Sequence, residues 1–219
     1  MATPQPSTLR RDRERELVLA TRALFDERGM LDAPIEEIAR SVGIARGLVY
    51  RHFSSKEELF VLTVTDYLGE LAEELDAAAG GGTPVEQLER GMRAYATFCA
   101  RYPAFLDSAL SLMHRPAREL HAMVSESVWL RLGQGMGRCV EHLERVLREG
   151  AVSGELDVAD PPYMANVLWT QVLGAMHLAR IRVGLREAAP GIPELFAVTP
   201  ERLVQTCVES ALATVGARR

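Results

Sequence analysis

Apolar residues recur every three or four positions along most of the chain, which is the period of an α-helix that buries one face. In residues 10–28, for example, Leu17, Leu24 and Phe25 share such a face. The strict alternation of apolar and polar residues that marks a half-buried strand is nearly absent. The pattern therefore predicts an all-α fold.

Glycines, prolines and capping boxes set the expected helix boundaries. Ser55 to Glu58 and Thr83 to Glu86 both have the Ser/Thr-x-x-Glu form of a capping box, and Gly29 is expected to end the first helix. About nine helices are predicted, over 10–28, 34–42, 46–52, 55 to the glycines at 80–82, 84–101, a short segment from 103, 117–149, 161–185 and 200–215. Residues 150–160 and 184–198 are expected to be loops.

Residues 34–53 have the pattern of two short helices that hinge at Gly43, with apolar anchors such as Ile38, Val49 and Phe53 where the two must pack. This spacing is typical of a helix-turn-helix, whose second helix can enter the major groove of DNA. The spacing alone leaves open an ordinary helical hairpin, which is common in all-α proteins.

The overall charge argues against a nucleic-acid partner, because the net charge is −5 and the pI is near 5.6, whereas DNA-binding domains are often strongly basic. The distribution of the charges changes this picture. Residues 1–60 hold ten basic and ten acidic residues, so the excess acidity lies in the later part of the chain. A local basic surface near the N-terminus is therefore compatible with the composition.

Cationic and hydroxyl side chains gather on the second helix of this motif and just after it. Such groups can bind phosphate oxygens and fix the register of a protein on DNA. Arg46, at the helix start, can also face a guanine edge, and Leu48 can contact a thymine methyl group. The candidate phosphate-binding residues are Arg46, Tyr50, Arg51, His52 and Lys56.

The N-terminal part of the chain, about residues 11–71, resembles the TetR family of transcriptional regulators in the order and spacing of a motif. The matching residues are Leu24, Phe25, Gly29, Ile38, Ala39, Gly43, Ile44, Gly47, Tyr50, Arg51, His52, Phe53, Ser55, Lys56, Glu57 and Leu59. The resemblance implies a DNA-binding domain at 11–71 that recognises a double-stranded operator. It further implies that Tyr50, His52 and Lys56 contact phosphates, that Arg46 and Gly47 approach the groove, and that the protein is a homodimer.

Three positions depart from the family pattern, in which Ser or Thr often occurs. Ala45 and Leu48 lack the hydroxyls that would cap the recognition helix or bind phosphate, and Pro34 leaves Asp32 or Ala33 as an imperfect cap for the first helix. A basic arm is a further candidate contact with phosphate or the minor groove, with a solvated terminus as the alternative. It consists of Arg10, Arg11, Arg13 and Arg15.

The resemblance gives residues 80–219 two roles, ligand sensing and dimerisation. The expected helix 161–185 is apolar on more than one side and must therefore be buried on two sides. A four-helix interface between two copies, made by residues 161–185 and 200–215, would bury it. The alternative is a central position in the core of a monomer.

Large or soft side chains on the helices of this part are candidates for a ligand pocket, because apolar pockets suit small hydrophobic effectors. The alternative reading of each residue is plain core. The candidates are Tyr95, Phe98, Phe105, Met113, Trp129, Met136, Trp169, Gln171 and His177.

Several other classes of protein are disfavoured. The sequence lacks the Gly-x-Ser-x-Gly, Walker A and His-Glu-x-x-His motifs, so no enzyme is expected. The three cysteines and the histidines lack metal-ligand spacing, and Gly133-x-Gly-x-Gly137 follows no strand, so neither a metal nor another cofactor is expected. No apolar leader or membrane span is found, which favours the cytoplasm.

The function predicted from the sequence is a homodimeric transcriptional repressor that a small, largely hydrophobic ligand releases from its operator. The sign of regulation is open, since an activator would have the same features. The alternative function is a helical protein-interaction scaffold with weak or no specific DNA binding.

Overall fold

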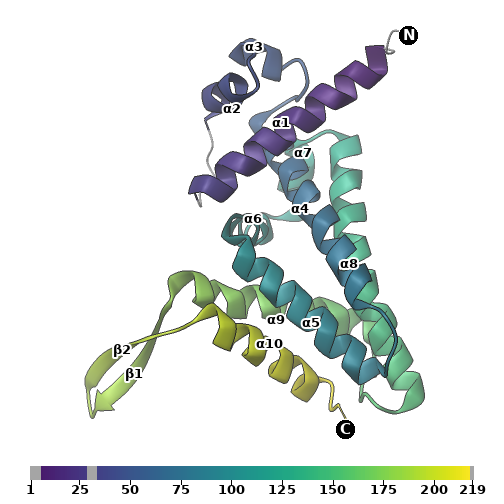
Figure 1. Ribbon diagram of the computed structural model, residues 1–219, viewed down its shortest axis with the longest axis vertical. Coiled ribbons are helices and arrows are strands. Elements are labelled where there is room, and N and C mark those ends of the chain that lie inside the picture. Colours follow the sequence, from purple (N-terminus) through teal and green to yellow (C-terminus); the bar gives the residue numbers. More distant parts are fainter. Residues whose placement is uncertain (1–5, 29–33, 218–219) are drawn as a thin grey trace. The chain divides into compact units, whose positions relative to one another are not determined.

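The computed structural model describes residues 6–28 and 34–217, and within these ranges it has ten helices and one two-stranded sheet (Figure 1). The all-α prediction is confirmed. The helices are α1 (Pro6–Arg28), α2 (Ile35–Ser41), α3 (Arg46–Val49), α4 (Lys56–Ala78), α5 (Pro84–Arg101), α6 (Pro103–Met113), α7 (Ala117–Met123), α8 (Glu126–Ser153), α9 (Pro161–Ile181) and α10 (Pro200–Thr214), and the strands are β1 (Val183–Ala189) and β2 (Ile192–Ala197). Gly29, Asp32 and Ala33, for which helix-end roles were predicted, lie outside the described residues.

The predicted helix over 117–149 is wrong, because the chain breaks it into α7 and α8 and α8 continues to Ser153. Val124 is extended at the break, with φ −129° and ψ 159°. Tertiary hydrogen bonds hold it there: the Ser55 hydroxyl donates to the Met123 carbonyl at 3.0 Å, and the Ser125 amide donates to the Glu58 carboxylate at 3.3 Å. The helical periodicity continues across the break, so it gave no sign of these contacts.

The predicted loop over 184–198 is also wrong, because β1 and β2 form an antiparallel ribbon there. The helix before it ends at Ile181 instead of about 185, where Arg182 takes a left-handed conformation with φ 61°. Gly191 turns the chain between the strands at φ 75°. Proline is tolerated in β2 because a strand of a two-stranded ribbon is always an edge strand.

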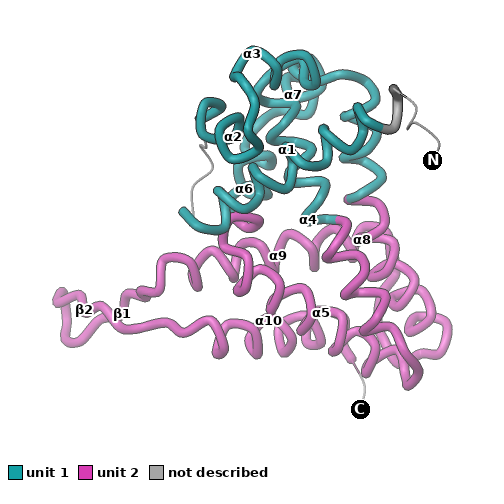
Figure 2. Tube along the Cα trace, turned by 45° about the horizontal axis from the view of Figure 1, so that its top comes forward, with its two compact units in different colours: residues 1–68, 107–135 teal, residues 69–106, 136–219 magenta. Residues whose placement is uncertain are grey.

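The described chain divides into two compact units (Figure 2). Unit 1 holds the described residues up to 68 together with 107–135, and unit 2 holds 69–106 and the described residues from 136 onward. Each unit therefore receives one part of α4 and one part of α8. The predicted division into domains 11–71 and 80–219 stays a prediction.

The core of unit 1 joins its first four helices. Leu17 of α1, Ile38 of α2, Val49 of α3 and Leu59 of α4 are all almost fully buried. Burial of one large apolar side chain contributes about 1.5–3 kcal/mol, so these anchors account for the packing of the short helices α2 and α3, which could not persist alone.

Polar contacts at the edge of that core fix α1 on α4. Arg22 donates to the Asp66 carboxylate at 2.8 Å, and its guanidinium lies 4.1 Å from the ring centroid of Tyr67. The Tyr67 hydroxyl donates to the Asp26 carboxylate at 2.5 Å. Burial, together with the adjacent Asp26 carboxylate, raises the pKa of Tyr67, so this hydroxyl remains a donor at neutral pH.

The core of unit 2 lies among α5, α9 and α10. Tyr95 of α5 stacks on Trp169 of α9 with ring centroids 4.3 Å apart, and both are buried. The predicted capping box at the start of α5 is confirmed in both directions, between Thr83 and Glu86. None of the described helices is both long enough and apolar enough to cross a membrane.

Candidate nucleic-acid interface

The hinge between α2 and α3 has the geometry that the sequence predicts for a helix-turn-helix. Gly43 adopts φ 69°, a left-handed conformation that costs a side-chain-bearing residue about 1–2 kcal/mol. The Ile44 amide then donates to the Ala39 carbonyl at 2.9 Å, which closes the turn. Glycine at position 43 therefore avoids a backbone cost that another residue would carry.

Helix α3 is shorter than predicted, since it ends at Val49 instead of about residue 52. A tight turn follows, in which the Arg51 amide donates to the Leu48 carbonyl at 3.2 Å and the His52 amide to the Val49 carbonyl at 2.9 Å. Ala45 is the N-cap residue of α3 and provides no side-chain cap, as its lack of a hydroxyl predicts. Pro34 has the same position before α2, again without a side-chain hydrogen bond.

The candidate contacts form the outer side of this segment, whereas its anchors form the inner side. Val49 is 1% exposed and Phe53 2% exposed. His52 is half-buried, and its Nδ1 atom has no hydrogen-bond partner in the described chain. The exposed candidates are Arg46, Gly47, Leu48, Tyr50, Arg51 and Lys56.

Gly47 is exposed, and the protein itself does not require a glycine there. A Cβ atom added at this position would meet no atom within 4 Å, and the backbone is not left-handed. The fold therefore leaves space at Gly47 that a groove edge could fill. The apolar side chain of Leu48 next to it is 38% exposed.

The charges on this surface are only partly neutralised within the protein. Arg46 pairs with Glu36 of α2 at 2.6 Å, so the carboxylate holds the guanidinium that would face a base. Arg51 has no acidic partner among the described residues. An exposed guanidinium without a partner can bind a phosphate without first breaking an internal ion pair.

The start of α4 is fixed by a network that also holds the α7–α8 break. The Glu58 amide donates to the Ser55 hydroxyl at 3.0 Å, which confirms one half of the predicted capping box. The Glu58 carboxylate instead accepts from the Ser54 amide at 2.5 Å and from the amide and hydroxyl of Ser125. Burial raises the pKa of Glu58, but the hydrogen bonds from Ser125 and Ser54 outweigh it and lower the pKa below its ordinary value.

A cleft of about 430 Å³ in unit 1 adjoins this network and the turn after α3. It brings Arg10 of α1 and Arg131 of α8 beside Tyr50, Arg51 and His52. Sequence reasoning missed Arg131, because it is 80 positions from Arg51 in the chain and only the α7–α8 break brings it near. Positive groups from three segments therefore line one cleft.

The predicted basic arm is the first part of helix α1 and not a separate extended segment. Two of its arginines are paired within the helix, Arg10 with Glu14 at 3.0 Å and Arg13 with Glu16 at 2.7 Å. Arg11 and Arg15 are exposed and have no acidic partner among the described residues.

Comparison with known proteins agrees with this geometry. The family model of the bacterial regulatory proteins of the tetR family matches residues 17–62, which span the segment described above. This match covers the helix-turn-helix part of the chain and agrees with the resemblance to the TetR family of transcriptional regulators that the sequence predicts.

Related proteins and solved structures resemble a longer part of this chain than residues 17–62. The transcriptional regulator HbdR of Aromatoleum sp. (strain CIB) is 31% identical over 112 residues, which cover 51% of this chain and 47% of HbdR. The chain therefore spans about half the length of that relative. A tetR-family regulatory protein from Rhodococcus RHA1 has the same fold, with a TM-score of 0.67, 18% identity, and coverage of 94% of this chain and 98% of that one.

A further structure with the same fold is RolR in complex with its ligand resorcinol. Its TM-score is 0.69 at 17% identity, over 97% of this chain and 91% of RolR. HbdR and the Rhodococcus protein are regulatory proteins, in agreement with the prediction that this chain is not an enzyme.

The predicted pocket residues of this chain do not form one group. Tyr95, Phe98, Phe105 and Trp169 are buried in unit 2, whereas Met136 and His177 of that unit are exposed. Gln171, half-buried, donates to the Ser210 hydroxyl. Met113 and Trp129 belong to unit 1, where Trp129 meets the His121 ring edge-on at 5.1 Å. The assignment of these residues to a ligand stays a prediction.

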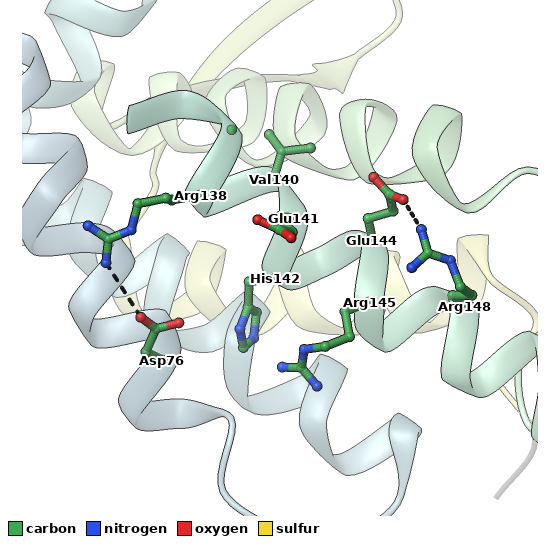
Figure 3. A pocket seen from close by; sticks show the side chains of 9 residues that line it. Asp76, Arg138, Val140, Glu141, His142, Glu144, Arg145 and Arg148 are labelled. Carbon is green, nitrogen blue, oxygen red and sulfur yellow. Dashed lines mark hydrogen bonds and ion pairs between the residues drawn. The ribbon is translucent and has the colours of Figure 1, made fainter. Parts of the chain in front are cut away.

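Two hollows lie within unit 2. A cavity of about 60 Å³ is lined by Cys99, Leu106 and Met176, among others. An open groove of about 530 Å³ runs along α8 and is lined mainly by charged side chains (Figure 3). These charges are largely paired within the groove, for example Arg138 with Asp76 at 3.6 Å. The groove therefore lacks the apolar lining that the predicted effector needs.

His142 lines this groove but is buried against α5. A Cβ atom at Gly91 would lie 3.3 Å from its Nε2 atom, and Nε2 has no hydrogen-bond partner in the described chain. Burial, assisted by the charge of Arg145, lowers the pKa of His142, so the ring is neutral at pH 7. No three His, Cys, Asp or Glu residues of the described chain are grouped as they would be around a metal ion.

Proposed function

We propose that this chain is a homodimeric transcriptional repressor that binds an operator through α3 and the turn after it. The observation that carries the proposal is the division of residues 46–53 into buried anchors and exposed donors. Arg46 and Leu48 would read base edges, and Tyr50, Arg51, His52 and Lys56 would bind phosphates. Such a repressor would act in the cytoplasm, beside the DNA it controls.

The surface of α9 supports the dimer. Five of its exposed positions, Tyr163, Asn166, Thr170, Gly174 and His177, are separated by steps of three and four residues and carry no acidic, lysine or arginine side chain, and the exposed Arg180 follows them near the end of the helix. Steps of three and four place residues along one seam of a helix. A second copy packed on this α9 seam would hold the two α3 helices at a fixed separation, which must match about 34–36 Å or a multiple for successive major grooves.

The proposed effector would bind in unit 2. RolR, which has the same fold, binds the small aromatic molecule resorcinol, and unit 2 has a buried aromatic pair and a small cavity lined in part by α5 and α9. A cavity of about 60 Å³ is smaller than a typical ligand pocket of about 300–1,000 Å³. The effector would therefore favour a more open arrangement of these helices, and through it a different separation of the α3 helices.

The test is fluorescence anisotropy of the purified chain on the intergenic DNA beside its own gene, with an unrelated duplex of equal length as control. We expect selective binding to the intergenic duplex, and release by a small aromatic or otherwise hydrophobic ligand found in a screen. Equal, weak binding to both duplexes and to the other promoter regions of the genome would contradict a repressor and favour the interaction scaffold.

A further inference from the structure

The antiparallel ribbon of residues 183–197, called the arm below, exposes nearly all of its side chains. Every residue of β1 and β2 is exposed except Gly184 and Phe196, which are half-buried. Figure 1 shows the arm projecting from the ends of α9 and α10. An isolated two-stranded hairpin is at best marginally stable in water, so an exposed arm calls for a surface to pack on.

On one face of the arm, the side chains are covered or paired by other residues of the arm. The Phe196 ring covers Gly184, where an added Cβ atom would lie only 2.3 Å from the ring. Next along the same face, Arg186 pairs with its cross-strand partner Glu194 at 2.7 Å. This face needs no further partner.

The opposite face is uncovered and mostly apolar, with Glu187 across from Pro193 toward the turn. Leu185 lies directly across from Leu195, and the two are 68% and 69% exposed. Val183, on the same face and two residues before Leu185, is 38% exposed. Apolar residues directly opposed on one face of a ribbon, and this exposed together, are characteristic of an interaction surface.

The position of this face points to one occupant. Ile181, the last residue of α9, is 54% exposed and lies one helical step of four after His177, so it extends the α9 seam toward Val183 and the arm. Gly174 in the middle of the seam would meet no atom within 4 Å if it carried a Cβ, so a second helix can approach closely there. The apolar face of the arm is thus continuous with the surface on which the dimer is proposed.

We propose that the apolar face of the arm docks on a second copy of this chain, so that each copy of the dimer clasps the other. The inference rests on the dimer of the proposed function and adds to it a contact that the helices alone do not supply. A two-fold dimer uses the same patch twice, so four leucines become buried for every dimer formed.

The experiment is sedimentation equilibrium of the full chain over a dilution series, with the double variant Leu185→Ser/Leu195→Ser. The matched control is Arg186→Ser/Glu194→Ser, which places the same two substitutions on the opposite face of the same strands. We expect the leucine variant to weaken dimerisation by at least about a hundredfold, because burial of a leucine is worth more than tenfold. The control should shift the dissociation constant by less than about threefold, because exposed ion pairs contribute little.

Circular dichroism and DNA anisotropy of the same samples separate the possible failures. A leucine variant with native helix content and an unchanged dimer constant would overturn the arm contact alone. A wild-type chain that is monomeric at every concentration would overturn the proposed dimer together with it.

A second measurement does not depend on the variants. Hydrogen exchange of the wild-type arm amides should slow at least about tenfold between a concentration where the chain is mostly monomer and one where it is mostly dimer. Exchange in the arm that is equally fast in both states would overturn the proposal.

Discussion

The helix-turn-helix of unit 1 and the α9 surface with its arm in unit 2 expose opposite chemistry. Around α3, the exposed side chains are mostly cationic or polar, and Arg51 has no internal acidic partner in the described chain. Along the α9 seam and the Leu185 face of the arm, the exposed side chains are mostly uncharged, and Arg186 and Glu194 on the other face of the arm pair with each other. The first surface suits an anion such as DNA, and the second suits another protein surface.

The largest loss of stability is expected for a substitution beneath the surface around α3. Phe53→Ala removes a 2% exposed ring and should destabilise unit 1 by about 3–5 kcal/mol, with loss of DNA binding as a consequence. Its neighbour Leu48, 38% exposed, is the control, since Leu48→Ala should cost less than about 0.5 kcal/mol and still weaken DNA binding. Thermal unfolding and anisotropy of both variants test this, and equal loss of stability in the two would contradict the assigned orientation of α3.

The network at Glu58 should make unit 1 sensitive to acid. Its pKa is lowered in the folded state, so its contribution to stability is complete above the ordinary value of 4.5 and is lost as the pH falls below that value. Glu58→Gln should cost about 1–3 kcal/mol at pH 7, because one of its amide or hydroxyl partners loses a charged acceptor.

Urea unfolding at pH 7 and at pH 4 measures the effect of Glu58. The difference between wild type and Glu58→Gln should shrink at the lower pH. A constant difference between the two would show that the carboxylate is not the stabilising form. Glu57→Gln, one position earlier and outside this network, is the matched control.

The ion pair between Arg46 and Glu36 should restrain DNA binding. Glu36→Gln removes the carboxylate and leaves the guanidinium free for the groove, so affinity for the operator should rise by about threefold to tenfold. Glu37→Gln, which lies next to it and pairs with Arg28 instead, should change affinity less. A fall in affinity for Glu36→Gln would mean that the ion pair positions Arg46 for DNA rather than competing with it.

The smallest effect is expected in unit 2, where His142 should make stability depend weakly on pH. Because its pKa is lowered in the folded state, its contribution to stability is lost as the pH falls below its ordinary value of 6.5. Wild type should therefore lose up to about 1 kcal/mol between pH 7.5 and pH 5.5 that His142→Gln does not lose. The exposed His114 provides the control, and an identical pH dependence in wild type and His142→Gln would contradict the assignment.

How far the sequence predicts the structure depends on how local the determinant is. The turn at Gly43, the anchors Val49 and Phe53, and the cap at Thr83 lie within a few residues of what they organise, and the structure shows each as predicted. The α7–α8 break depends on Ser55 and Glu58, which are far away in the chain, so periodicity could not show it.

The arm was missed for a related reason. Pro190 and Pro193 favour a loop when the segment is considered alone, and only the pairing of Leu185 with Leu195 across the turn makes it a ribbon. The candidate pocket had the weakest basis, because side-chain type alone placed Trp129 and Trp169 together although they belong to different units. The exposed candidates for DNA contact are where the pattern predicts them, and their contact with DNA stays a prediction.

The central claim is that the surface around α3 binds DNA phosphates. The most direct test is the salt dependence of operator affinity for wild type, Arg51→Gln, and Arg148→Gln as a control on α8 of unit 2. The account predicts that Arg51→Gln weakens binding and lowers the slope of log affinity against log salt by about one, the loss of one phosphate contact. It predicts no change of slope for Arg148→Gln. An unchanged slope for Arg51→Gln, or the same change in both variants, would contradict it.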